Sequence, residues 1–494
     1  MPTLEWIGKS KVINHHQEVP FRVLERKYSF DENGQHDEDN GSENMIIRGD
    51  NLEALKALLP RYEGRIKCIY IDPPYNTGNE GWVYNDNVND PKIKKWLGEV
   101  VGKEGEDLTR HDKWLCMMYP RLKLLQKLLA NDGIIFISID DTECSNLILI
   151  CNEIFGASNF VANVSWQRTY SPRNDSKGIV SEVEHLVVFS KNPGWQPNKL
   201  PRTEAMDSRY KNPDNDVAPW KSSDAFAPGA ATHQGMVYAI QHPFTGKMLY
   251  PSNGRCWRYQ QSSMLEYMQG WCNYRLENLH DEKERARVCG IDESAVRKDV
   301  LAIVLEEPLE VSAAKAQKVY NRGRWPGFYF TKGGYGGIAR KTYLENVGGR
   351  LPTNLWMYEE TGHTDEAKKE LISLFGGRSP FDTPKPTRLL DFVLKVAGTS
   401  ETLMLDSFAG SGTTAHAVLN ANKADNGNRH FILIEMMDYA DSITAERVKR
   451  VIKGYGEGKN AVDGTGGNFS FYDLGEPLLV GDCLNEAVAP EKIR

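Results

Sequence analysis

The sequence predicts an α/β protein whose core is one largely parallel sheet, assembled from two separated parts of the chain with a long insertion between them. From Met45 to about residue 191, short apolar runs alternate with amphipathic stretches, and the same texture returns after residue 350. Such alternation is typical of strands and helices in a parallel sheet. Residues 192–350 are instead rich in Pro, Gly, Trp and Tyr, so we expect a separate module or a large insertion there.

The first part of the chain is expected to begin with a strand and then alternate. The strands are short apolar runs, and the helices are longer stretches in which apolar residues recur at helical spacing, as Leu52, Leu55 and Leu58 do. In chain order we expect a strand at 45–48, a helix at 51–59, a strand at 66–71, a helix at 114–130, a strand at 133–139, a helix at 143–155, and strands at 161–166 and 185–191.

The second part of the chain repeats the strand and helix texture. We expect a helix at 387–396, a strand at 402–406, a glycine-rich turn, a helix at 413–420 and a strand at 430–435. Because strands occur on both sides of the middle region, one sheet is expected to draw on both parts. No internal repeat is visible, which excludes solenoids and propellers.

The chain divides into five expected segments: an N-terminal extension at 1–44, a first core part at 45–191, the middle region at 192–350, a second core part at 351–455 and a C-terminal extension at 456–494. The N-terminal extension contains the run Asp31 to Glu43, with six acidic residues and no basic ones. A run of this kind cannot contribute to a core. We therefore expect a solvated loop.

The composition is that of a soluble globular protein, with 494 residues, 40% hydrophobic and 26% charged. No apolar run approaches the length of a membrane span and the N-terminus lacks the zones of a signal peptide, so we expect a cytoplasmic protein without membrane contact. The eight cysteines are scattered with no C-x-x-C pair. They are interpreted as reduced thiols, and no metal site is expected.

The net charge of −7 argues weakly against a polyanion as ligand, but the charges are unevenly distributed. Residues 161–350 contain 26 Lys and Arg against 20 Asp and Glu, whereas the rest of the chain contains 34 against 47. The acidity therefore lies outside the middle third.

The first candidate site is the run LDSFAGSGTT, from Leu405 to Thr414, between an expected strand and an expected helix. Gly410 and Gly412 allow a tight turn, and the next helix offers free N–H groups to a ligand. The following strand ends in Glu435, whose carboxylate can accept hydrogen bonds from a ribose. The run has no Lys-Ser/Thr of a P-loop and no third glycine, which favours S-adenosylmethionine over NAD or ATP.

The second candidate site is DPPYNTG, which follows the expected strand at 66–71. The two prolines end the strand, so the Asp72 carboxylate and the Pro73 carbonyl remain available as acceptors at the carboxyl edge of the sheet. They can accept both protons of an exocyclic amino group while the ring of Tyr75 stacks on the base that carries it. The alternative is a simple Pro-Pro turn with a packing tyrosine.

These two motifs resemble the catalytic and cofactor motifs of amino-group DNA methyltransferases of the β class. Longer stretches, including IIRGDNLEALKAL, KNPDNDVAPWKSSD, FDTPKPTRLLDFVLK and FAGSGTTAHAVLNANKADNGNRHFILIE, resemble the modification (Mod) subunit of type III restriction-modification systems. The resemblance covers most of the chain between Met45 and Glu435. It implies a circularly permuted, Rossmann-like, S-adenosylmethionine-dependent methyltransferase fold with seven core strands and an inserted target-recognition region.

The resemblance also implies residue roles. Asp50 is expected near the adenine of the cofactor, although it can equally cap the following helix, and Glu435 near the ribose. Lys385, Pro386 and Thr387 are expected to open a helix near the methionine end of the cofactor. The catalytic residues implied are Asp72, Pro73, Pro74 and Tyr75, and the implied cofactor-binding residues are Asp50, Lys385, Thr387, Asp406, Phe408, Gly410, Gly412, Thr413 and Glu435.

The function expected from the motifs and the resemblance is methylation of adenine N6 in double-stranded DNA. The base must leave the stack to be reached, and no histidine is required as a base. The middle region is expected to bind DNA through residues such as Arg255, Arg258 and Arg324. Its aromatic residues can either contact DNA or form a core: Trp220, Trp257, Tyr259, Trp271 and Trp325.

Two other functions stay open on sequence alone: a catalytically silent DNA-recognition subunit, and a methyltransferase acting on amino groups of RNA or protein. A homodimer and a separate restriction (helicase and nuclease) subunit are expected partners from the resemblance, with an orphan enzyme as the alternative. The recognition sequence does not follow from the residues. The segments at 89–110 and 264–319 depart from the shorter relatives, so their roles are open.

Overall fold

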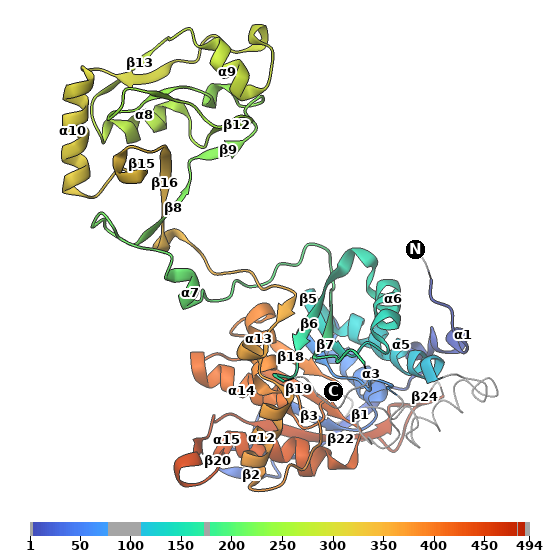
Figure 1. Ribbon diagram of the computed structural model, residues 1–494. Helices are drawn as coiled ribbons and strands as arrows, with labels where there is room; N and C mark the ends of the chain where they lie inside the picture. The colour runs from blue at the N-terminus through green and yellow to red at the C-terminus, as the bar shows by residue number, and fades with distance from the viewer. Residues whose placement is uncertain (1–2, 78–109, 172–177, 482, 490–494) are drawn as a thin grey trace. The chain divides into compact units, whose positions relative to one another are not determined.

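The computed structural model describes residues 3–77, 110–171, 178–481 and 483–489, and every structural statement here concerns those residues. Gly78 of the proline motif and the segment at 89–109 lie outside them. The chain forms two compact units, shown in Figure 1. Unit 1 comprises residues 1–200 and 351–494, and unit 2 comprises Pro201–Arg350.

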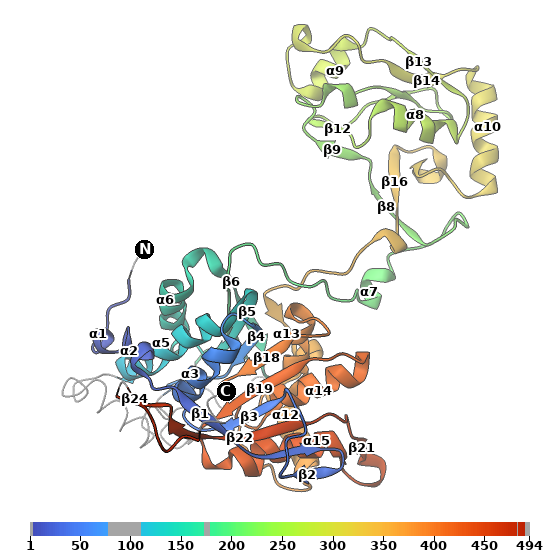
Figure 2. The same ribbon diagram turned by 180° about the vertical axis from the view of Figure 1, so that it is seen from behind.

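Unit 1 is built around an eleven-stranded sheet in which most neighbouring central strands are parallel. Figure 2 shows it from behind. In spatial order its strands are β17 (Leu355–Trp356), β6 (Phe160–Gln167), β7 (Val183–Ser190), β5 (Leu129–Ile139), β4 (Ile66–Ile71), β18 (Leu403–Asp406), β19 (His430–Glu435), β3 (Met45–Arg48), β22 (Phe469–Pro477), β1 (Arg22–Asp31) and β2 (Gly34–His36).

All seven strands expected from sequence are contiguous in this sheet, from β6 to β3. The strands of the second core part, β18 and β19, are inserted between β4 and β3 of the first. One sheet is therefore built from both parts of the chain. The helix expected to reach Ala130 instead ends at Leu128, because Leu129 already pairs with Ile66 as the start of β5.

The N-terminal run is not entirely a loop, so that expectation is wrong in part. Asp31 ends β1, and Gly34 to His36 form β2 in a hairpin. The Asp31 side chain accepts a hydrogen bond from the Asn33 N–H at 2.8 Å, and Gly34 has a φ of 121°. A local side-chain bond and one permissive glycine close this turn in spite of the acidic composition.

Helices cover both faces of the sheet. On β4, Ile69 and Ile71 pack with α3, α5 and α6, whereas Cys68 and Tyr70 pack with α12, α13, α14 and α15, as the alternation of side chains along a strand requires. The helices of unit 1 are α1 (Lys9–Val12), α2 (His15–Glu18), α3 (Asn51–Tyr62), α5 (Arg110–Leu128), α6 (Cys144–Phe155), α11 (Tyr358–Thr361), α12 (Thr364–Phe375), α13 (Thr387–Ala397), α14 (Thr413–Asp425) and α15 (Glu446–Lys453). Among the described residues, no helix has the length and apolarity of a membrane span.

Unit 2 has small sheets of its own and an aromatic core. Trp220, Trp257 and Trp271 are at most 4% exposed and pack in this core, which favours the core interpretation of these three residues over DNA contact. The longer elements of unit 2 are β8 (Trp220–Asp224), β12 (Arg255–Trp257), α8 (Gln261–Gln269), β13 (Tyr274–Glu277), α9 (Glu282–Cys289), β14 (Ala302–Leu305), α10 (Leu309–Arg322), β15 (Phe328–Phe330) and β16 (Ile338–Tyr343).

A buried ion-pair cluster in unit 2 joins β16 to the loop at 214–216. The ammonium of Lys341, whose side chain is fully buried, lies 2.5 Å from carboxylate oxygens of both Asp214 and Asp216. Asp214 also accepts from the indole of Trp220 at 2.8 Å and from the N–H of Trp325 at 2.7 Å. Much of the motif KNPDNDVAPW therefore has a structural explanation.

Candidate active site

The two sequence motifs meet at one edge of the sheet. β4 and β18 are adjacent and parallel, with Cys68 opposite Met404 and Ile69 opposite Leu405. Asp72 follows the end of β4, and the glycine-rich turn follows Asp406 at the end of β18. Because parallel strands present their carboxyl ends at the same edge, the base motif and the turn are neighbours.

Asp72 lies in a dense polar cluster. Both of its carboxylate oxygens accept hydrogen bonds from the Lys385 ammonium, at 2.9 and 2.8 Å. Oδ1 also accepts from the Tyr75 hydroxyl at 2.9 Å, and the Lys385 nitrogen lies 5.1 Å from the centroid of the Tyr75 ring. Lys385 was expected only near the cofactor. In the structure its ammonium binds Asp72 and its backbone carbonyl accepts from the Thr413 hydroxyl at 3.2 Å, so this residue contacts both motifs.

Sequence reasoning missed Glu184, on β7. Its Oε2 accepts from the Tyr75 hydroxyl at 3.0 Å and lies 3.6 Å from the Lys385 ammonium, and its Oε1 accepts from Arg168 at 2.9 Å. The run HLVVFS identified the strand, but the acidic residue just before it belongs to no motif. Only the pairing of β7 with β5, next to β4, brings it to Asp72.

Burial sets the proton affinities in this cluster. It raises the pKa of the Asp72 carboxyl, with the Lys385 ammonium acting against the shift. It also raises the pKa of Glu184, but Lys385 and Arg168 outweigh it and the net pKa is lowered. For Lys385, burial lowers the pKa, and the charges of Asp72 and Glu184 overcome this and raise it. Lys385 therefore stays charged.

Buried hydrogen bonds from Trp114 and to Glu143 hold the proline turn in place. The indole of Trp114, fully buried on α5, donates to the Pro74 carbonyl at 2.7 Å. Asn76 has a left-handed φ of 60° and donates to Glu143 at 2.5 Å. Among the described residues, no backbone N–H or side chain donates to the Pro73 carbonyl, which is the second acceptor expected for an amino group.

The Glu435 carboxylate is hydrogen-bonded to the glycine turn itself. Its Oε2 accepts from the Gly410 N–H at 2.8 Å and its Oε1 from the Met437 N–H at 3.0 Å. Gly412 has a φ of 81°, and a Cβ there would lie 3.0 Å from the carbonyl oxygen of Thr444. Both the backbone conformation and the space at this position therefore require glycine.

Asp406 is buried inside the turn. It accepts from the Phe408 N–H at 3.0 Å and from the Thr414 hydroxyl at 2.6 Å. Burial raises its pKa to about 7, although both hydrogen bonds act in the opposite direction. The hydrogen bonds show that Asp406 shapes the turn, and the cofactor role expected for it stays a prediction.

A buried arginine supports the turn, and it was also missed. Arg447 on α15 is fully buried, and its guanidinium donates to the hydroxyls of Thr413 at 2.8 Å and Thr387 at 3.0 Å, and to Glu370 at 2.9 Å. Arg447 also touches His416. The only signal in the sequence was an arginine on the apolar side of a helix.

The remaining expected residues are placed as follows. Asp50 caps α3, accepting from the Leu52 N–H at 2.8 Å, and its other oxygen lies 3.2 Å from Arg121. It follows β3, which is the parallel neighbour of β19, so Asp50 and Glu435 lie at the ends of adjacent strands. Histidines contact acids or pack: His111 with Glu143, His185 with Asp141, and His416 buried beside Arg447.

The arginines expected to bind DNA are in unit 2 and differ in their contacts. Arg255 forms an ion pair with Asp224, and Arg258 reaches the Phe226 carbonyl at 3.4 Å. Arg324 is exposed and has a left-handed φ of 50°. It lines a recess of about 490 Å³ with Arg322, Tyr259, Ser263, Glu266, Tyr267, Gly270 and Pro326.

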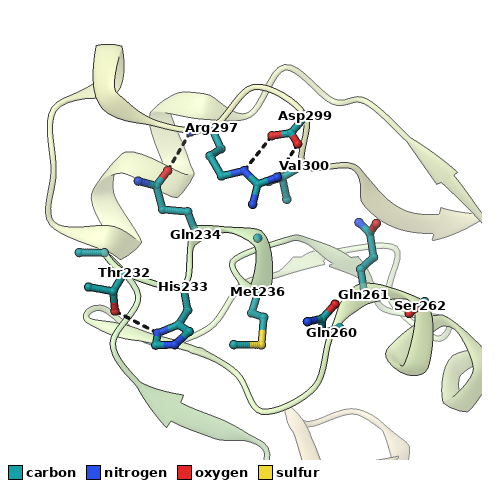
Figure 3. Close-up of a pocket in the computed structure, with 12 residues that line it drawn as sticks. Thr232, His233, Gln234, Met236, Gln260, Gln261, Ser262, Arg297, Asp299 and Val300 are labelled. Carbon is teal, nitrogen blue, oxygen red and sulfur yellow. Dashed lines mark hydrogen bonds and ion pairs between the residues drawn. The ribbon is translucent and has the colours of Figure 1, made fainter.

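A second recess in unit 2, of about 540 Å³, is lined mainly by polar residues (Figure 3). Its arginine, Arg297, is already neutralised by Asp299, with a hydrogen bond of 2.9 Å from Nε. Gln234 accepts from the Arg297 N–H at 2.8 Å. This recess therefore offers amides and hydroxyls rather than free positive charge.

Comparison with known proteins identifies related chains. The sequence profile of N6 and N4 methyltransferases, described as DNA methylase, matches residues 66–446. The chain is 32% identical over 440 residues to the StyLTI Mod subunit, a type III restriction-modification enzyme subunit of Salmonella typhimurium, and the match covers 84% of this chain and 58% of that subunit. It is 28% identical over 403 residues to the type II methyltransferase M.KpnI of Klebsiella pneumoniae, covering 80% of this chain and 81% of that protein.

Among solved structures, the cytosine-N4-specific PvuII DNA methyltransferase matches with a TM-score of 0.36 and 12% identity, over 82% of this chain and 86% of that one.

The residues at the glycine turn fit a nucleoside-type methyl donor. Two acidic side chains, Asp50 and Glu435, end the strands beside the turn, as acceptors for amino and hydroxyl groups, and the turn has no lysine for a phosphate chain. The profile match covers more than three quarters of the sequence. The chain therefore belongs to the DNA methylase family, whose methyl donor is S-adenosylmethionine.

Proposed function

We propose that this protein methylates the N6 amino group of an adenine that has been flipped out of double-stranded DNA. The observation that carries the proposal is the adjacency of β4 and β18, since it puts the Asp72–Pro73 acceptors next to the turn that fits the methyl donor. In the family that the sequence resembles, an Asp at the start of the catalytic motif favours adenine N6, whereas a serine there is commoner in cytosine N4 enzymes, and this sequence has Asp72.

In the proposed reaction the protein acts mainly by positioning. S-adenosylmethionine supplies the methyl group when bound. Asp72 and the Pro73 carbonyl accept hydrogen bonds from the amino group of the target base and hold its nitrogen lone pair toward the donor, while the ring of Tyr75 stacks on the base. The nitrogen loses one proton after it has acquired the methyl group. Tyr75 is 5% exposed and its hydroxyl donates to Asp72, so its ring position is well fixed. Positioning of this kind supplies much of an enzyme's rate.

We further propose that the protein is the modification subunit of a type III restriction-modification system, with an orphan enzyme as the alternative. The relatives named as Mod subunits support this, although the chain spans only 58% of the StyLTI subunit. A homodimer, a restriction subunit as partner, recognition of DNA by unit 2 and circular permutation of the core belong to the same proposal. The order of β4 before β18 along the chain supports the permutation.

The deciding experiment incubates the purified protein with labelled S-adenosylmethionine and duplex DNA, RNA or protein in parallel. Label in DNA, recovered as N6-methyladenine after digestion to nucleosides, supports the proposal. Recovery as N4-methylcytosine would keep the family and overturn the base assignment. Label in RNA or protein alone, or no transfer at all, would favour the other functions considered. Light scattering at micromolar concentration tests the dimer.

A further inference from the structure

Asp72, as the structure shows it, is fully engaged before any base arrives. Its two oxygens accept from Lys385 at 2.9 and 2.8 Å, and Oδ1 also accepts from Tyr75. This matters because the amino nitrogen of the target gains positive charge as it accepts a methyl group. A lysine ammonium held on Asp72 cancels the negative charge that would stabilise this change.

Glu184 is the one other carboxylate that the structure places within ion-pair distance of the Lys385 ammonium among the described residues, at 3.6 Å. Glu184 is 6% exposed and is linked to the same cluster by the Tyr75 hydroxyl. Its second oxygen is held by Arg168, whose side chain is 40% exposed. Lys385 can therefore exchange one carboxylate for the other by a small rotation, without leaving the buried cluster.

We propose that Glu184 is a positioning residue of methyl transfer: it takes over the Lys385 ammonium when the target amino group binds Asp72, so that the charge of Asp72 serves the base. This inference rests on the proposed function. Two further observations support it. The Tyr75 hydroxyl already bridges Asp72 and Glu184, at 2.9 and 3.0 Å, and Lys385 and Arg168 together outweigh the effect of burial on the pKa of Glu184, which keeps Glu184 ionised.

The charge of Glu184 also acts on Asp72 directly, which gives the test a readout beyond rate. The groups that face Asp72 are Lys385, Glu184, Tyr75, Tyr70 and Asp406. Glu184 in turn faces Arg168 and Asp140. Removing the negative charge of Glu184 lowers the pKa of Asp72, so the acid limb of the rate profile should move to lower pH. A role of Glu184 in packing or hydrogen bonding alone, without its charge, predicts no such movement, and the double variant described below tests whether Glu184 takes over Lys385.

The main experiment measures single-turnover methylation of duplex DNA at saturating S-adenosylmethionine across pH. We expect Glu184→Gln, which keeps an acceptor for Tyr75, to lose tenfold or more in rate, to shift the acid limb downward and to bind S-adenosylmethionine within about threefold of wild type. The matched control is Asp140→Asn. Asp140 is a nearby carboxylate that accepts from Thr142, and its removal should change the rate less than about threefold.

The decisive experiment asks whether a second substitution restores the rate of the Glu184→Gln variant. If Glu184 serves to draw Lys385 away, then Lys385→Met added to Glu184→Gln should raise the rate several-fold at alkaline pH, where Asp72 stays ionised without the Lys385 ammonium, because no ammonium is left to compete for Asp72. A further fall in the double variant, or a Glu184→Gln rate equal to wild type, would overturn the inference. If Glu184→Gln fails to fold, Arg168→Gln provides the test: without Arg168 the pKa of Glu184 rises, so the rate should fall at acidic pH and recover as Glu184 ionises, and a rate loss that is the same at every pH would contradict us. A wild-type protein that does not methylate DNA would instead refute the proposed function.

Discussion

In the proposed reaction Asp72 binds the target base and not the methyl donor, so its loss should affect methyl transfer and donor affinity differently. Asp72→Ala should reduce methyl transfer on the order of 10²-fold or more, because a positioning acceptor is lost. Affinity for S-adenosylmethionine, measured by calorimetric titration, should stay nearly unchanged. Methylation within about tenfold of wild type would show that Asp72 does not hold the base.

Asp406 makes the stability of the protein depend on pH. Its pKa in the folded state is raised to about 7, above the roughly 3.9 of an unfolded aspartate. The folded state therefore binds the proton more tightly, and this contribution to stability is present below about pH 4 and is lost as pH rises through 7. Because one pKa unit corresponds to about 1.4 kcal/mol, the lost contribution is on the order of a few kcal/mol.

We expect Asp406→Asn to remove this dependence. Thermal unfolding of the variant between pH 4 and 8 should show a flatter Tm profile than wild type, with the variant gaining relative stability toward pH 8. Identical profiles for the two proteins would mean that Asp406 does not titrate differently in the folded state.

At the residue scale, what sequence could predict depended on separation along the chain. Asp72, Pro73, Pro74 and Tyr75 are contiguous, so one motif was enough to predict that they lie together. Lys385 contacts Asp72 across 313 positions and Glu184 contacts Tyr75 across 109. Contacts of this kind depend on strand order, which local patterns do not encode.

At the scale of elements, the turn after β18 depends on glycine. Gly412→Val should abolish binding of S-adenosylmethionine without unfolding unit 1, because the new side chain meets the Thr444 carbonyl and valine disfavours the left-handed backbone of this position, so the turn that fits the methyl donor must change shape. The control is Gly290→Ala, at a glycine that also has positive φ (68°) but whose Cβ would meet nothing within 4 Å. Calorimetry should show lost affinity in the first variant and unchanged affinity in the second.

Strands of the central sheet were predictable because they are buried on both faces and read as apolar runs. The strands β22 and β1, near one edge of the sheet, could not be predicted in this way. β1 has the burial of a mixed strand, with Arg22, Arg26 and Lys27 among its residues, and β22 ends in LGEP. They pair antiparallel with each other, and half-exposed strands of this kind carry a weaker pattern.

At the scale of the whole molecule, DNA affinity should fall steeply with salt, because phosphates neutralised by arginine release counterions. Arg324→Ala together with Arg322→Ala should weaken binding and reduce the slope of log affinity against log salt by about 0.9 per lost contact. Arg297→Ala is the control, because Asp299 already pairs with that side chain. Fluorescence anisotropy at several salt concentrations measures both. An equal effect of all three changes would show that DNA does not bind specifically at the recess lined by Arg322 and Arg324.

Unit 2 was the least predictable part of the molecule. From the sequence, the many Trp and Tyr residues could either contact DNA or pack in a core. In the structure Trp220, Trp257 and Trp271 are buried in the core of unit 2. Arg324 shows why the recess could not be derived: its N–H is bonded to the Asp214 carbonyl at 2.7 Å, across more than a hundred positions. The left-handed backbone there is held by the same Asp214 that pairs with Lys341.

The position of β22 between β3 and β1 sets an order of assembly during synthesis. β1 pairs with β2 on one edge, but its partner on the other edge is β22, Phe469–Pro477, which follows it by more than four hundred residues. A growing chain therefore carries β1 with this edge unpaired until synthesis has passed Pro477. Pairing over so long a separation is slow and leaves an open edge exposed in the meantime. The nascent protein should consequently depend on chaperones most heavily until β22 has been synthesised, when the strands from β6 to β3 are already available to form the rest of the sheet.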